Sequence, residues 1–363
     1  MGIKLTLLIV FFVVMVAVGL YSRKHARSVD GFVLGGRSVG PWLTAFAYGT
    51  SYFSAVVFVG YAGQFGWKYG LASTWIGIGN AVLGSLLAWV VLGRRTKVMS
   101  QHLKSKTMPD FFGERYGSKA LKIMASAIVF VFLVPYTASI YNGLSRLFEM
   151  AFDIPYTYCV VVMAVFTGIY VILGGYMATA INDFIQGIIM LIGIVAVIAA
   201  VLSGQGGFIE AVRKMAELPS DVPVTMGQPG AFTSFFGPDP LNLLGVVILT
   251  SLGTWGLPQM IGKFYAIKDE KAINTGTVIS TLFACVVAGG SYFLGGFGRL
   301  FDGKAIYDET GNVVFDRIIP HMLSSLPDIL IGIVVVLVLS ASMSTLASLV
   351  LTSSSTLTLD FLK

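Results

Sequence analysis

The sequence predicts an all-α protein that crosses a membrane many times. Of its 363 residues, 56% are hydrophobic and only 12% are charged, and the mean hydropathy is +0.83. This composition is far from that of a soluble domain. Apolar stretches near or above the ~20 residues that a helix needs to cross a bilayer recur along the chain, and two of them are interrupted by glycine, proline and hydroxyl residues. Together these observations predict a single transmembrane domain over residues 1–363 that contains discontinuous helices.

Nine segments are expected to span the bilayer. The first apolar run is followed by basic residues and lacks a small-residue cleavage pattern, so we expect a retained helix and not a removed signal peptide. Gly174 and Gly175 leave room only for a tight turn, which makes the fifth and sixth segments an antiparallel hairpin. The expected spans are 4–21, 41–65, 71–92, 121–150, 156–174, 178–203, 241–264, 275–298 and 327–359.

The positive charges predict how the chain is oriented. A net charge of +6 is compatible with nucleic-acid binding, but sixteen of the 24 Lys and Arg residues lie in segments 22–40, 93–122, 263–271 and at the C-terminus. These are alternate connections, which the positive-inside rule places together in the cytoplasm. The N-terminus is then outside, the lipid bilayer is the expected surrounding, and no nucleic-acid partner is expected.

Two connections carry helix signals of their own. Thr107 precedes Met108 and Pro109 in a basic loop, which is compatible with a short capped helix on the inner surface or with a solvated loop. The outer loop 204–240 contains an amphipathic pattern at 208–215, which is typical of a surface helix.

The second span contains the first interruption. Residues 41–65 carry no charged side chain, yet Gly49, Thr50, Ser51 and Tyr52 stand where a plain membrane helix would carry Leu or Ile. A break is therefore expected here. Because the bilayer interior offers no water to freed carbonyls, a break must be buried in protein or face a cavity, where its oxygens can bind a cation. We interpret this break as half of a binding site.

Polar residues in two later spans are further candidates. Pro135 is expected to kink the fourth span, with Tyr136 facing inward, although a kink can also be purely structural. Asp183 opens the sixth span, close to Asn182 and Gln186. Intramembrane acids are usually functional, but a carboxylate at the membrane edge can instead cap the helix.

The seventh span repeats the interruption, with Gly253, Gly256 and Pro258 inside it. Two Gly/Pro-interrupted spans in corresponding places of two halves indicate a transporter with inverted repeats and a site near the bilayer midplane. The second interrupted span comes five spans after the first, and an odd number reverses the orientation of the second copy. The pattern alone leaves a channel as an alternative.

The ninth span is rich in hydroxyl groups. Helical spacing puts Ala341, Ser344, Thr345 and Ser348 on one face. Ser and Thr are common packing residues in membrane helices. A row of oxygens on one face is also what a small, hard cation needs once it loses its water.

An ordered set of motifs runs along the chain. It comprises Gly35-Gly36-Arg37-Ser38, Gly49-Thr50-Ser51, Trp75-Ile76-Gly77-Ile78-Gly79, Pro109-Asp110-Phe111 with Arg115-Tyr116, Arg146-Leu147-Phe148-Glu149, Gly174-Gly175 followed by Asp183 and Gln186, Gly256 with Pro258, and Met343-Ser344-Thr345-Leu346. Each motif alone is weak, but the ordered set is specific. Over essentially its whole length the chain resembles the sodium/solute symporter family, most of all its sodium/proline branch.

The resemblance implies a leucine-transporter-like fold of two inverted five-helix repeats, preceded by one extra N-terminal helix at 4–21. The first repeat then covers 41–203, and 241–363 supplies the first three helices of the second. The second repeat is incomplete on this reading, so we expect the chain to be a truncated piece. The resemblance also implies an integral, multi-pass protein of a bacterial plasma membrane.

The resemblance implies Na+ as the co-transported ion. The residues of the first sodium site supply backbone oxygens or hydroxyls, and they are Thr50, Phe53, Ala341, Ser344 and Thr345. Some family members carry a second sodium ion, whose site here would include Asp183 and Ser348 with help from Ser344. Ala347 replaces one hydroxyl of that second pattern.

The residues that the resemblance implies as solute contacts lie at the two breaks and beside Pro135: Tyr52, Tyr136, Thr254 and Trp255. Tyr52 and Thr250 stand where the proline transporters carry an aspartate and a tryptophan, which argues against assuming proline. The expected partner is a small organic solute of the amino-acid, vitamin, carboxylate or sugar class.

The predicted function is sodium-coupled symport that imports this solute by alternating access. A proton-coupled symporter that uses Asp183 ranks lower, because His25, His102 and His321 all lie in expected loops. A sensor or channel with the same fold is a further alternative. An enzyme is not expected, because no nucleophile–base or metal-ligand pairing occurs within the spans.

Overall fold

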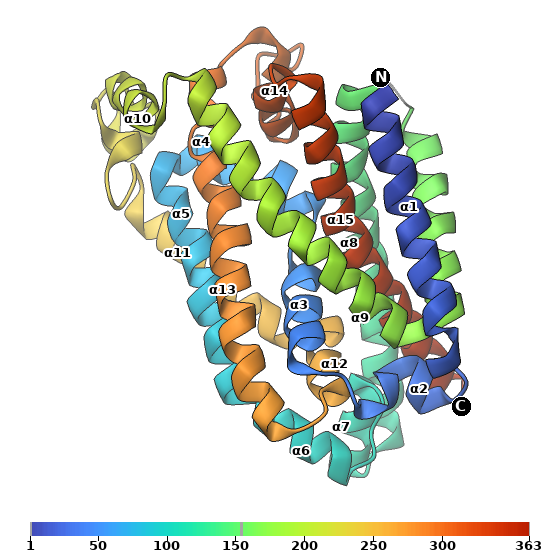
Figure 1. Ribbon diagram of the computed structural model, residues 1–363. Coiled ribbons are helices and arrows are strands. Elements are labelled where there is room, and N and C mark those ends of the chain that lie inside the picture. The colour runs from blue at the N-terminus through green and yellow to red at the C-terminus, as the bar shows by residue number, and fades with distance from the viewer. Residues whose placement is uncertain (1, 153–154, 363) are drawn as a thin grey trace.

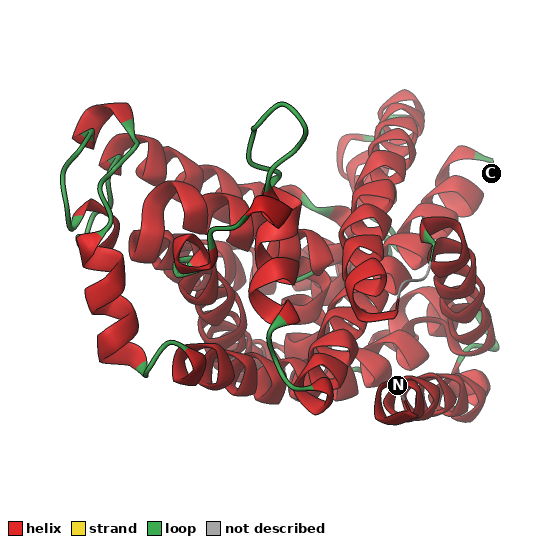
Figure 2. Ribbon diagram, turned by 90° about the horizontal axis from the view of Figure 1, so that it is seen from above, coloured by secondary structure: helices red, strands yellow, loops and turns green. Residues whose placement is uncertain are grey.

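The computed structural model describes residues 2–152 and 155–362, and within them the chain is helical, with only isolated bridges such as Val39 with Ile267. The helices stand side by side in one bundle (Figure 1), which is seen end-on in Figure 2. In chain order they are α1 (Gly2–Ser22), α2 (Val29–Leu34), α3 (Pro41–Tyr52), α4 (Ala62–Tyr69), α5 (Thr74–Gly79), α6 (Arg94–His102), α7 (Met108–Tyr116), α8 (Lys119–Phe152), α9 (Tyr156–Gly204), α10 (Phe208–Glu217), α11 (Pro240–Leu252), α12 (Pro258–Ala266), α13 (Glu270–Gly295), α14 (Ile318–Ser324) and α15 (Asp328–Thr356).

Long apolar helices supply the membrane passes. The described residues contain six that are long and apolar enough to cross, or seven with the bent pair Pro240–Gly256 and Pro258–Ala266. Two of them, Val56–His102 and Val160–Gly204, have 47 and 45 residues, more than twice what one crossing needs. Each reverses at a glycine with positive φ, Gly70 (φ 60°) and Gly175 (φ 53°). Val160–Gly204 therefore makes two passes, and Val56–His102 makes the third pass and completes the second pass, which begins in α3. The described part of the chain thus contains the nine expected segments.

The third pass is longer than expected. The sequence predicted that it ends at residue 92, just before Arg94 and Arg95. The helix instead continues through π-helical turns into α6 and ends at His102. One side of this extension packs against α12. Lys97 is buried and its Nζ donates to the carbonyl of Tyr265 at 3.5 Å. The basic residues therefore do not end the helix, because one of them faces inward.

Both expected breaks are present. Helix α3 ends at Tyr52, and Phe53 is extended (φ −86°, ψ 117°) before the helix resumes. Helix α11 ends at Leu252, passes through one 3₁₀ turn, and meets α12 at an angle of 52°. The two interrupted passes meet inside the bundle, where α3 lies beside α12, whereas α11 lies at the edge of the bundle (Figure 1).

Several smaller predictions are decided by the structure. Thr107 caps α7, its hydroxyl accepting from the backbone N–H of Asp110 at 3.1 Å, so the short capped helix is confirmed. The amphipathic helix expected within 204–240 is confirmed as α10. The interpretation of Asp183 as a helix cap is wrong, because α9 restarts after Gly175 and Asp183 lies two turns inside it.

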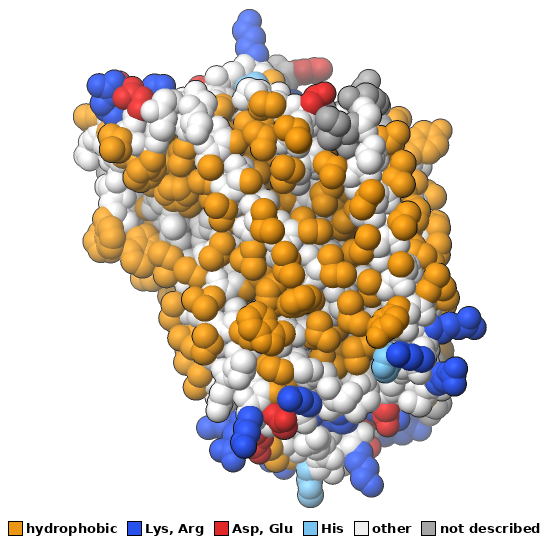
Figure 3. Space-filling model, in the orientation of Figure 1, with side chains coloured by type: hydrophobic (Ala, Val, Ile, Leu, Met, Phe, Trp, Pro, Cys, Tyr) orange, Lys and Arg blue, Asp and Glu red, His pale blue; other side chains and the backbone are white. Residues whose placement is uncertain are grey.

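The outer surface has the layout of a membrane protein. Hydrophobic side chains cover the middle of the face shown in Figure 3, and charged side chains gather at its two ends. The end near α2, α6 and α7 carries a large share of the Lys and Arg residues, in agreement with the basic connections read from the sequence.

Glycine allows α4 to touch α13 backbone to backbone. A Cβ atom added at Gly66 would lie 2.0 Å from the carbonyl oxygen of Gly295, and one added at Gly295 would lie 2.0 Å from that of Ala62. Neither carbonyl can move without shifting a helix. This crossing holds the half of the second pass that follows the break against the eighth pass.

We expect Gly66→Ala to lower the free energy of unfolding by roughly 1–3 kcal/mol, the usual cost of overpacking. The measurement is thermal unfolding of the purified protein in detergent. Gly245→Ala is the matched control, because a Cβ there meets nothing within 4 Å and alanine favours a helix more than glycine does. Equal melting temperatures for the two variants would show that the close crossing is wrong.

Candidate functional site

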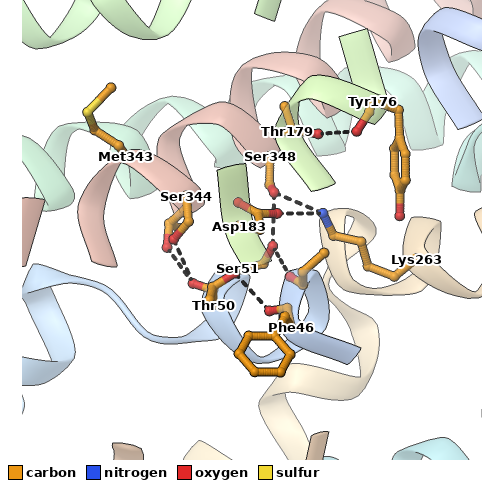
Figure 4. A network of polar contacts seen from close by, with 12 residues as sticks. Phe46, Thr50, Ser51, Tyr176, Thr179, Asp183, Lys263, Met343, Ser344 and Ser348 are labelled. Carbon is orange, nitrogen blue, oxygen red and sulfur yellow. Dashed lines mark hydrogen bonds and ion pairs between the residues drawn. The ribbon is translucent and has the colours of Figure 1, made fainter. Parts of the chain in front are cut away.

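The break after α3 meets α15 through one serine hydroxyl. Ser344 Oγ lies 3.1 Å from the carbonyl oxygen of Thr50 (Figure 4) and 3.0 Å from that of Ala341. Thr50 is in the last turn of α3, so its carbonyl has no helical partner beyond the break. The hydroxyl on α15 therefore stands where the interrupted helix exposes oxygen.

The neighbouring threonine completes the group. Thr345 Oγ1 lies 3.2 Å from the Thr50 carbonyl, 3.3 Å from the Phe53 carbonyl and 3.1 Å from the Ala341 carbonyl. The five residues predicted to form the first site are thus brought together by two elements nearly 300 positions apart in the sequence. Each of them is at most 1% exposed.

These five oxygens outnumber the protons available to them. Each hydroxyl carries one proton, but Ser344 is within reach of two carbonyls and Thr345 of three. Each carbonyl also has a second lone pair, which stays without a proton in this fully buried place. A cation placed among the five oxygens could accept electron density from all of them. The set contains no carboxylate, so a single positive charge suits it better than the double charge that carboxylate-rich sites bind.

The candidates for the second ion, Asp183 and Ser348, both contact the ammonium group of a lysine. Lys263 Nζ is 3.6 Å from Asp183 Oδ2 and 3.1 Å from Ser348 Oγ, and Ser348 Oγ is 2.9 Å from Ser51 Oγ (Figure 4). Ser51 follows Thr50 directly. The second cluster is therefore joined to the first through α3 and α15.

Sequence reasoning missed Lys263. It was grouped with the basic inner connection 263–271, whereas the structure places it inside α12 with 2% exposure. Lys263 faces inward because the interrupted helix resumes at Pro258 and α12 then runs into the bundle. The available signal was spacing: Gln259 and Lys263 are four residues apart on a short helix, hence on one face, and both are buried.

Two of the four candidate solute residues share a cavity. Tyr52 and Thr254 line a space of about 20 Å³ between the two broken helices and α13. Phe53 and Asn80 also line it. The amide of Asn80 accepts hydrogen bonds from Thr250 and Ser251. Asn80 was not among the candidates, because a lone asparagine in a long apolar helix gives no pattern by itself.

The other two candidates lie at the edge of this region. Trp255 turns its indole N–H to the carbonyl of Leu83 at 2.8 Å, which ties the second break to the third pass. Tyr136 packs beside a cluster that includes Leu133 and Leu346. Neither residue lines the cavity of Tyr52 and Thr254.

Comparisons with known proteins give the family and the fold. The model of the sodium:solute symporter family matches residues 32–363. The sodium/proline symporters of Staphylococcus aureus strains JH9 and JH1 are each 32% identical over 367 residues, which cover 98% of this chain and 67% of each relative. The solved outward-open, substrate-bound structure of a Na+-coupled sialic acid symporter matches with a TM-score of 0.80 at 15% identity, covering 99% of this chain and 73% of that one.

These matches decide the broad expectations. The structural match confirms the leucine-transporter-like, all-α fold. The relatives are transporters, which confirms a transporter and not an enzyme, and an integral, multi-pass membrane protein. With the family model running from residue 32 to residue 363, this chain belongs to the sodium:solute symporter family.

Proposed function

We propose that the protein is a sodium-coupled symporter that imports a small organic solute by alternating access. The observation that carries the proposal is the meeting of five buried oxygens at the break after α3. They belong to Thr50, Phe53, Ala341, Ser344 and Thr345, and they form the proposed sodium site. The sodium/proline and sialic acid symporters described above support the same ion.

Coupling between ion and solute follows from a shared segment. The carbonyls of Thr50 and Phe53 face α15, while the side chains of Tyr52 and Phe53 line the cavity beside α13. An ion that fixes the backbone of this break also fixes the walls of the solute cavity. Each ligand then raises the affinity for the other, and the effect must be reciprocal.

The cavity supports the need for a conformational change. About 20 Å³ is room for roughly one water molecule, whereas small-ligand sites usually measure about 300–1,000 Å³. The solute therefore requires α3 and α13 to separate at this level. Among the residues that the structure describes, no charged side chain lines the cavity, which favours recognition by aromatic contact and hydrogen bonds. Proline, sialic acid and other amino acids, carboxylates, vitamins and sugars are the classes to test.

Orientation and internal symmetry belong to the same proposal. The basic end near α2, α6 and α7 faces the cytoplasm of a bacterial cell, which leaves the N-terminus outside. Residues 41–203 form the first five-helix repeat and 241–363 the first three helices of the inverted second one. Under this assignment α3 and the pair α11–α12 are the equivalent broken helices.

The experiment reconstitutes the protein into liposomes and presents a panel of radiolabelled solutes of these classes. We expect one solute to accumulate under an inward sodium gradient and not under an equal potassium or choline gradient. A pH gradient without sodium tests the proton-coupled alternative through Asp183, and downhill flux without accumulation would indicate a channel. Accumulation driven by protons alone, or no dependence on sodium, would contradict the proposal.

A further inference from the structure

The ammonium group of Lys263 is buried, and oxygen atoms from two other helices contact it. Its Nζ contacts Asp183 Oδ2 on α9 at 3.6 Å and Ser348 Oγ on α15 at 3.1 Å. It also lies 5.2 Å from the centre of the Tyr176 ring. The lysine side chain is 3% exposed and that of Asp183 is 1% exposed. The two side chains form an ion pair in the interior of the bundle, and the second broken helix supplies the lysine.

The surroundings of the ammonium resemble a cation site. Within the described residues, neither carboxylate oxygen of Asp183 accepts a hydrogen bond, and Lys263 is the only cationic side chain found within ion-pair distance of it. Ser348 Oγ adds a second oxygen and Ser51 Oγ stands 2.9 Å behind it. A cavity of about 40 Å³ adjoins this place and is lined by Lys263, Ser348 and Gln259. One negative charge, two hydroxyls and room for a small ion are what remains when the ammonium is removed.

The same place is joined to the proposed sodium site. Ser51 is the residue after Thr50, and Ser348 is one helical turn beyond Ser344. A positive charge held at Lys263 therefore acts on the same two helices that the sodium ion would bridge. It differs from a free ion in being unable to leave.

We propose that Lys263 is a tethered cation that permanently fills a second cation position, so that the protein binds one sodium ion and not two. The inference rests on the proposed function for the first ion. A neutral side chain at position 263 leaves the Asp183 carboxylate without its counter-charge in a place that is costly for a lone charge. Sodium then enters the space between Asp183 and Ser348.

The test is equilibrium binding of ²²Na+ to the purified protein in detergent. We expect one ion per chain for the wild type and two for Lys263→Gln. The matched control is Lys268→Gln, because Lys268 follows closely in the sequence but its side chain is 50% exposed. We expect it to bind one ion. The double variant Asp183→Asn with Lys263→Gln removes the carboxylate as well and returns to one ion.

Stability in sodium gives a second readout. A ligand that binds only the folded state raises the melting temperature with its concentration. The melting temperature of Lys263→Gln should therefore rise more steeply with NaCl than that of the wild type, with choline chloride as the reference salt. Lys263→Met is the second variant, purified in NaCl throughout. Failure of both variants to fold in NaCl would contradict the inference, since sodium would not have replaced the ammonium.

The outcomes separate this inference from the proposed function. One ion in both the wild type and Lys263→Gln overturns the tethered cation and leaves the first sodium site standing. Two ions in the wild type overturn it as well. No ion in the wild type but one in Lys263→Gln supports the tethered cation and contradicts the proposed first site.

Discussion

Thr345→Val is expected to raise the sodium concentration that gives half-maximal uptake by roughly tenfold or more. The substitution keeps the shape of the side chain and removes the one oxygen that lies within 3.3 Å of three carbonyls. A hydrogen-bonding group opposite a charge contributes about 1.5–3 kcal/mol, and every 1.4 kcal/mol is about tenfold in affinity. The measurement is initial uptake into proteoliposomes over a range of external sodium concentrations at constant ionic strength.

The chain offers a close control for this effect. Ser342 lies on the same helix and is equally buried, but the one hydrogen bond that its hydroxyl donates in the described part of the chain goes to the carbonyl of Val338 in its own helix. Ser342→Ala should leave the sodium dependence unchanged, and Thr345→Ser, which keeps the oxygen, should recover much of the loss. The assignment of Thr345 fails if Thr345→Val and Ser342→Ala need the same sodium concentration.

Asp183→Asn is expected to lower the free energy of unfolding by about 3–5 kcal/mol, the usual cost of removing one partner of a buried ion pair. The amide leaves the Lys263 ammonium buried with Ser348 as its remaining polar neighbour in the described structure. The measurement is chemical or thermal unfolding of the purified protein in one detergent and one salt.

A double variant tests whether the lost stability comes from the unpaired charge of Lys263. Asp183→Asn combined with Lys263→Met replaces the pair by groups of similar volume without charge, and such replacements are often neutral or stabilising. Most of the lost stability should return. As a reference, Arg213→Gln breaks an exposed ion pair with Glu210 on α10 and should change stability little. An Asp183→Asn protein as stable as the wild type would show that the two side chains are not paired.

The sequence predicted those parts of the site that depend on local patterns. Gly49, Thr50 and Ser51 weaken the helix where they stand, and the break follows within a few residues. The spacing of Ala341, Ser344 and Thr345 is set by the helical repeat alone, so their common face could be read before any contact was known. Only the meeting of these two pieces required the structure, or the family resemblance that brought them together.

The parts that depend on tertiary placement could not be read in the same way. Lys263 at the edge of an expected span has the same local pattern as a lysine that marks the cytoplasmic side, and only the angle between α11 and α12 turns it inward. Asp183 looked like a residue at the membrane edge because the start of its helix was placed too late. The direction of Trp255, whose indole binds the Leu83 carbonyl, depends on the neighbouring pass.

The central claim is that one sodium ion joins the broken α3 to α15. The most direct measurement is a high-resolution map of the protein prepared in sodium, compared with one prepared in choline. The claim predicts a sodium-dependent peak bonded to the oxygens of Thr50, Phe53, Ala341, Ser344 and Thr345, at about 2.3–2.6 Å as for calcium, an ion of similar size. A map in which the two hydroxyls keep their hydrogen bonds to these carbonyls in both salts, with no ion between them, would contradict it.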